Sequence, residues 1–116
     1  MAYHDRQLDA LGDPTRRAIL ARLISGEMAV VDLAKEFPVS RPAISQHLRI
    51  LKQAQLVVDR AAGTRRLYQL NPEGFASLRE YFEQFWGQAL HAFQRKFHEA
   101  TKPEATKQDM IKEEQS

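Results

Sequence analysis

Apolar residues in the first third of the chain recur at the three- and four-residue spacing of amphipathic helices. This spacing predicts a first, short helix over residues 5–11 and a second helix that starts after Asp13. Asp13 can accept hydrogen bonds from the first helical amides, Pro14 suits the first helical position, and Gly26 ends the pattern. A third helix is predicted over residues 31–37, because the proline that follows cannot continue it.

The stretch VSRPAISQHLRIL has the pattern of a short amphipathic helix whose polar side chains gather on one side. Ile44, Leu48 and Leu51 lie four and three residues apart, which places them on one side of a helix over Ser40–Ala54. The tight FPVS turn joins this helix to the preceding one, so residues 31–54 are predicted to form a helix-turn-helix. The polar side chains that face elsewhere are Arg41, Ser45, Gln46, Arg49 and Lys52, with His47 near the boundary.

After this helix the pattern changes from helical spacing to short runs rich in Val, Leu and Tyr. The runs LVVDR and RRLYQL are separated by AAGT, where Gly63 can take a positive φ, so residues 56–70 are predicted to form a β-hairpin. Asn71 then offers a cap for a long helix over residues 72–100, and residues 101–116 are polar and expected to be disordered. The predicted fold class is mainly α with a small β-hairpin, a winged helix-turn-helix with added N- and C-terminal helices.

Composition narrows the class of protein. The 116 residues suit a single domain, which we place at residues 1–100. Because the chain has no cysteine, disulfides and thiolate metal sites are excluded. The chain contains no long apolar run and no apolar N-terminal segment of signal-peptide type, so we expect no membrane partner and a cytoplasmic location.

Positive charge is concentrated in one segment. The net charge is only +2, but residues 39–70 carry six Lys/Arg and one Asp, a balance of +5, whereas residues 1–38 and 71–116 carry −1 and −2. This local excess is typical of a face that binds a polyanion. A solvated basic surface is the alternative.

Three motifs, LGDPTRRAILARL, SRPAISQHLRILKQAQLV and GTRRLYQLNPEGF, together resemble the ArsR/SmtB family of bacterial winged-helix repressors. The resemblance covers about residues 5–100, with all elements in the family's order. It implies a homodimer that binds a palindromic DNA operator and is released by an inducing signal, such as an unidentified small molecule. It also implies that the helix Ser40–Ala54 is the recognition helix, that the helix over residues 31–37 supports it, and that the hairpin around Gly63 is the wing.

The chain departs from the family pattern at several positions. Relatives often have AGLV where this chain has AQLV, so Gln55 is expected in a left-handed conformation that costs about 1 kcal/mol. Metal sensors with a thiolate site carry ELCVCDL, but here the stretch is EMAVVDL, with Ala29 and Val31 in place of the two ligands. His91 and His98 in the last helix are seven residues apart, about 10 Å along the axis, too far to hold one ion within a chain. We predict no cofactor and no metal, with pairing of these histidines across a dimer left open.

The polar face of the predicted recognition helix has the chemistry that reads DNA. A helix fits the major groove, where arginine can donate to guanine or phosphate and glutamine can pair with adenine. His47 either contacts a phosphate or packs beside Leu51, and the wing arginines either meet the DNA backbone or minor groove or form a screened basic edge. The predicted DNA contacts are Ser40, Arg41, Ser45, Gln46, His47 and Arg49 on the helix, and Arg60, Gly63, Thr64, Arg65 and Arg66 on the wing.

The last predicted helix has a broader apolar face than an isolated surface helix needs. One stripe begins at Phe75 and Leu78, and a second, rotated stripe follows it, so one can cover the domain while the other meets a partner subunit. The alternatives are that both stripes serve the monomer core or wall a ligand pocket. The predicted dimer interface comprises Leu8, Leu11, Phe82, Phe85, Trp86, Ala89, Leu90, Phe93 and Phe97.

The sequence favours a dimeric, sequence-specific transcriptional repressor. Two other functions stay open: a sensor whose metal or small-molecule ligand defines its activity, and an interaction module whose aromatic helix binds another protein. No enzymatic activity is expected, because the histidines have no acidic or nucleophilic partners at fixed spacing and no Gly-rich phosphate loop is present.

Overall fold

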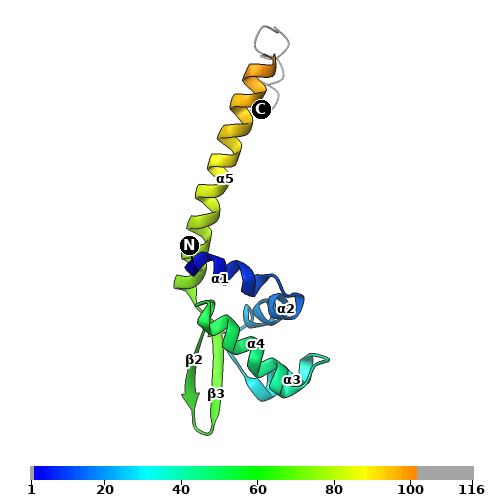
Figure 1. Ribbon diagram of the computed structural model, residues 1–116. Helices are drawn as coiled ribbons and strands as arrows, with labels where there is room; N and C mark the ends of the chain where they lie inside the picture. Colours follow the sequence, from blue (N-terminus) through cyan, green and yellow to red (C-terminus); the bar gives the residue numbers. More distant parts are fainter. Residues whose placement is uncertain (1, 102–116) are drawn as a thin grey trace. The chain divides into compact units, whose positions relative to one another are not determined.

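The computed structural model describes residues 2–101, so the predicted tail lies outside the described residues except for Thr101, which is helical. The chain divides into two compact units, Met1–Tyr81 and Phe82–Ser116. The architecture is mainly α with a small antiparallel sheet, which confirms the predicted fold class (Figure 1). The elements are α1 (Ala2–Leu11), α2 (Pro14–Leu23), β1 (Met28–Ala29), α3 (Val30–Glu36), α4 (Arg41–Gln53), β2 (Val57–Ala62), β3 (Arg65–Leu70) and α5 (Pro72–Thr101).

Two helix starts follow the predicted caps. The Asp13 carboxylate accepts from the Arg16 backbone N–H at 3.0 Å, and the Ser40 hydroxyl oxygen accepts from the Ala43 N–H at 3.3 Å. The hydrogen bond from the Arg16 backbone holds the pKa of Asp13 below its ordinary value. The predicted bounds of α1 and α3 were wrong by one to three residues, and the start of α3 at Ala29 carries no side-chain cap that the sequence would mark.

The core of the first unit is one apolar cluster. The predicted stripe of α4, Ile44, Leu48 and Leu51, is fully buried in it. Burying each of these side chains stabilises the fold by about 1.5–3 kcal/mol. The other buried members are Ala10, Ile19, Leu20, Leu23, Leu33, Ala54, Leu56, Val57 and Leu78.

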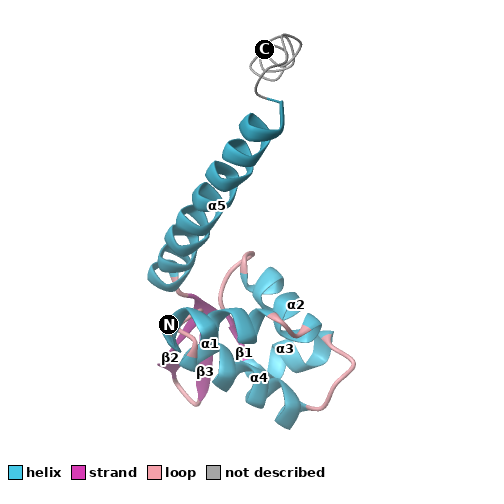
Figure 2. Ribbon diagram, turned by 45° about the horizontal axis from the view of Figure 1, so that its top comes forward, coloured by secondary structure: helices cyan, strands magenta, loops and turns pink. Residues whose placement is uncertain are grey.

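The sheet has three strands rather than the two of the predicted hairpin. Its order is β1-β3-β2, with Ala29 paired to Leu67 and Leu67 paired to Arg60 (Figure 2). The strand β1 is too short to show an alternating pattern, so the sequence could not reveal it. The turn between β2 and β3 has Gly63 at its first position with a φ of 66°, a conformation that glycine adopts without strain.

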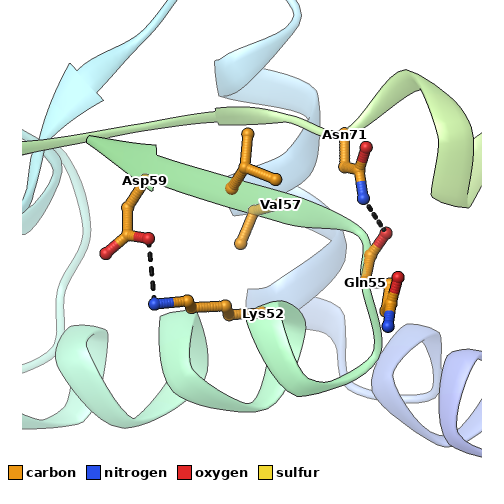
Figure 3. A pocket seen from close by; sticks show the side chains of 6 residues that line it. Lys52, Gln55, Val57, Asp59 and Asn71 are labelled. Atoms are coloured by element: carbon orange, nitrogen blue, oxygen red, sulfur yellow. Dashed lines mark hydrogen bonds and ion pairs between the residues drawn. The ribbon is translucent and has the colours of Figure 1, made fainter.

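The C-terminal end of α4 is tied to the first turn of α5. Gln55 has a φ of 64°, which confirms the predicted left-handed residue. Its carbonyl oxygen accepts from the Asn71 side-chain amide at 3.0 Å (Figure 3). Gly74 packs directly against the same carbonyl, and its own carbonyl accepts from the buried Gln7 side chain at 3.2 Å. This junction fixes where α1, α4 and the start of α5 meet.

None of the helices in residues 2–101 combines the length with the hydropathy that crossing a bilayer requires.

Candidate nucleic-acid interface

The polar face of α4 presents a row of exposed side chains. Ser40, Arg41, Ser45, Gln46 and Arg49 are all exposed, because the opposite side of the helix is anchored in the core. The guanidinium group of neither arginine has a hydrogen bond or ion pair with any other residue of the described chain. Two unpartnered guanidinium groups on one helix form a surface that can donate to guanine edges or to phosphates.

His47 lies at the edge of this face and is half-buried. Its Nδ1 is 3.4 Å from Arg16 Nη1, at the start of α2. Arginine only donates hydrogen bonds, so His47 Nδ1 accepts and the ring proton belongs on Nε2. Arg16 also donates to the carbonyls of Ala10 at 2.8 Å and Asp9 at 3.2 Å, which ties the end of α1 to α4. The neighbour that orients His47 is therefore Arg16, which the sequence did not point to.

One carboxylate links α4 to the wing, the hairpin of β2 and β3. Asp59 in β2 accepts from Lys52 Nζ of α4 at 2.9 Å and from Arg66 Nη1 of β3 at 3.1 Å (Figure 3 shows the first pair). We call this triad the inner clamp. The Asp59 side chain is only 8% exposed. Burial raises the pKa of Asp59, but the hydrogen bond from Lys52 and the charges of Lys52 and Arg66 hold it below its ordinary value.

Two further ion pairs, which we call the outer clamp, hold the other wing arginines. Arg60 in β2 donates to both carboxylate oxygens of Glu27, at 2.5 and 3.2 Å, and Arg65 in β3 pairs with Asp32 of α3. The hydrogen bond from Arg60 holds the pKa of Glu27 below its ordinary value. Strand alternation and register place Arg60 and Arg65 on the sheet face opposite to Arg66. The wing therefore has one clamp on each face.

The structure changes the interpretation of the predicted wing contacts. Arg60, Arg65 and Arg66 were predicted to meet the DNA backbone or minor groove, or else to form a screened basic edge, and in the described chain each has a carboxylate partner. Of these partners, only Asp59 could have been suspected from sequence, as the single acidic residue among residues 39–70. The other two predicted wing residues, Gly63 and Thr64, lie exposed at the turn.

The apolar face of α5 is divided along the helix and not around it. Phe75 and Leu78 pack on the core of the first unit. From Phe82 onward the same face is exposed: Phe82 is 44%, Phe85 54%, Trp86 63%, Leu90 48% and Phe93 66% exposed, and Ala89 is exposed too. Of the predicted first stripe only Phe75 and Leu78 pack on the domain, so the prediction that one whole stripe covers it was wrong.

Three other residues of the predicted dimer interface are less exposed than this row. Phe97 is half-buried, with its ring 6.4 Å from that of Phe93, and Leu8 and Leu11 are half-buried against the chain's own core. An exposed row of large aromatic residues marks a surface that a partner can cover.

Two shallow hollows lie beside α4. One of about 260 Å³ is lined by the residues around the inner clamp, among them Lys52, Val57 and Asp59. The other, of about 350 Å³, lies where α1 and α2 meet α4 and includes Arg6 and Arg16. Residues 2–101 contain no group of three His, Asp or Glu side chains placed to hold a metal ion.

Comparisons with known proteins agree with this arrangement. Residues 13–58 match the family described as "Bacterial regulatory protein, arsR family". The HTH-type transcriptional regulator Rv2034 of Mycobacterium tuberculosis is 57% identical over 77% of this chain and 83% of its own length, and the transcriptional repressor SdpR of Bacillus subtilis is 48% identical over 53% and 69%.

Solved structures show the same fold. One described as a "possible transcriptional regulator for arsenical resistance" has a TM-score of 0.64, 51% identity and coverage of 69% of this chain and 83% of its own. The homodimeric winged helix-turn-helix DNA-binding domain Mb0332 of Mycobacterium bovis has a TM-score of 0.62 and 30% identity, over 75% of this chain and 81% of its own. This chain therefore belongs to the ArsR family of bacterial regulatory proteins and has the winged helix-turn-helix fold.

Proposed function

We propose that this protein regulates transcription as a homodimer, and that it represses by binding a palindromic operator in duplex DNA. The observation that carries the proposal is the exposed face of α4, where Arg41 and Arg49 have no partner in the described chain. Such a helix fits the major groove, and its side chains reach base edges while the wing meets the adjacent backbone. The protein acts on DNA in the cytoplasm and has no catalytic role.

The proposed dimer is built on the exposed aromatic row of α5, from Phe82 to Phe93. Two copies of one recognition helix, related by a twofold axis, match two half-sites of an inverted repeat about one helical turn apart. The homodimeric relative supports this assembly. The inducing signal is a separate part of the proposal, and a small molecule is a better candidate than a metal.

The test has two stages. Sites selected by the purified protein from a random DNA pool are expected to contain an inverted repeat, and binding should weaken steeply as salt rises. Replacing Arg49 with alanine should then weaken binding to the selected site by roughly 5- to 150-fold, the range for one arginine contact to a base. Arg95→Ala on α5 removes the same charge from an exposed position and should leave binding within about twofold.

The proposed function would be contradicted if the protein selected no common sequence from the DNA pool. It would also be contradicted if Arg49→Ala and Arg95→Ala lost the same amount of DNA affinity. If Arg49→Ala left DNA binding intact while disruption of the aromatic row of α5 abolished capture of another protein, the chain would instead be an interaction module.

A further inference from the structure

The carboxylates that hold the wing arginines differ in their exposure. The Asp59 side chain of the inner clamp is 8% exposed, whereas Glu27 and Asp32 of the outer clamp are 31% and 41% exposed. Their partners Arg60 and Arg65 are themselves more than half exposed. The two clamps therefore respond differently when another anion approaches.

Removing a cation from a buried carboxylate leaves a charge that water cannot solvate, and this is strongly unfavourable. Removing Arg60 from Glu27 leaves a carboxylate that water does solvate, so the pair contributes little and can open. A phosphate accepts from a guanidinium in the same two-pronged geometry as a carboxylate. Arg60 and Arg65 can therefore exchange partners, whereas Arg66 is held in place by Asp59.

The acidic partners come from the part of the chain that borders the sheet. Glu27 directly precedes β1, which pairs with β3, and Asp32 lies in the first turn of α3. Both carboxylates thus reach the sheet face that carries Arg60 and Arg65.

We propose that Glu27 and Asp32 are intramolecular competitors of DNA phosphate for Arg60 and Arg65, and that they set the strength of the wing's contacts with the DNA backbone. This inference rests on the proposed function. Binding that ignores sequence depends almost wholly on phosphate contacts. By occupying the wing arginines, the two carboxylates weaken such binding and leave the unpartnered Arg41 and Arg49 of α4 as the dominant cationic contacts.

The test measures binding of the full chain to a labelled random-sequence duplex of about 30 base pairs, by fluorescence anisotropy over a range of salt concentrations. Glu27→Gln and Asp32→Asn should each tighten binding about two- to fivefold at low salt. The gain should shrink as salt rises, because the added contacts release counterions. The magnitude of the slope of log K against log salt should grow by up to about one per released arginine.

The chain offers a matched control in Glu36 of α3, which holds Arg22 of α2, not a wing arginine, through a similar exposed pair at 2.7 and 3.3 Å. Glu36→Gln changes the net charge equally and also releases an arginine, but it should not tighten binding beyond measurement error. Adding Arg60→Ala to Glu27→Gln should cancel the gain of the latter.

The outcomes show whether the inference fails alone or together with the proposed function. If the unaltered protein binds no duplex, both are wrong. If it binds DNA but Glu27→Gln and Glu36→Gln raise the affinity equally, the effect is one of net charge and only the inference is overturned. Weaker binding by Glu27→Gln would show that the outer clamp positions the wing and does not compete with DNA. That result would also overturn the inference.

Discussion

Gly74 and Gly87 lie in the same helix, α5, yet an alanine at each position should have opposite effects on stability. At Gly87 an added Cβ meets no atom within 4 Å, whereas at Gly74 it would lie 1.7 Å from the carbonyl oxygen of Gln55. An ordinary carbon–oxygen approach is about 3.3 Å, so the junction would have to open by about 1.6 Å. Because the obstructing atom belongs to the backbone, no side-chain rotation can relieve the clash.

The expected size of the effect follows from the contacts at this junction. Opening it strains or breaks the hydrogen bonds from Asn71 to Gln55 and from Gln7 to Gly74, each worth about 1 kcal/mol. Overpacking destabilises the fold by roughly a further 1–3 kcal/mol, and the better helix propensity of alanine offsets about 1 kcal/mol of the total. We therefore expect Gly74→Ala to lower the free energy of unfolding by about 2–4 kcal/mol.

Thermal unfolding monitored by circular dichroism, at one fixed protein concentration, provides the measurement. For a domain of this size, Gly74→Ala should lower Tm by about 10 °C or more. Gly87→Ala, on the polar side of the helix one heptad before Gln94, should raise Tm by a few degrees because only its propensity changes. A Tm for Gly74→Ala equal to or above that of the unaltered protein would refute the steric argument.

Two further predictions concern the inner clamp and the aromatic row. The pKa of Asp59 is below its ordinary 3.8, so its stabilisation is complete above about pH 5 and is lost as the pH falls below 3.8 and through the lowered pKa of the folded state. Asp59→Asn should thus cost about 1–3 kcal/mol in denaturant unfolding at pH 7 and progressively less as the pH falls below 3.8, and a cost independent of pH would contradict this. Trp86 is the single tryptophan, so its emission should shift to the red when a dimer dissociates on dilution. Phe85→Ala should weaken the dimer by at least about 30-fold in analytical ultracentrifugation, with Gln94→Ala unchanged, and equal dissociation constants would show that the row is not the interface.

The helices were predictable because their signals are local. The caps Asp13 and Ser40 and the buried stripe of α4 depend on residues a few positions apart, and the structure shows each where the pattern placed it. The left-handed Gln55 was predicted instead from the family resemblance, because relatives often have glycine at this position.

The candidate site was only partly predictable. Periodicity alone placed the exposed arginines of α4, because a helix with one buried side must expose the other. The partners of Arg60 and Arg65 lie 33 residues away in sequence, in a loop and in a helix, and no pattern in the chain links them. The sequence also did not predict that position 74 requires glycine. That requirement comes from the carbonyl group of Gln55, which packs against Gly74 only in the folded chain.

The sequence by itself thus determined which segments form helices, which sides of them are buried, and where positive charge concentrates, because these properties depend on neighbours along the chain. Only the tertiary structure decided which of those charges are unpartnered. Folding pairs Glu27, Asp32 and Asp59 with the wing arginines and leaves the side chains of Arg41 and Arg49 unpaired in the described chain. The physical reason is that ion pairs and close backbone contacts act over a few ångströms in space, regardless of separation along the chain.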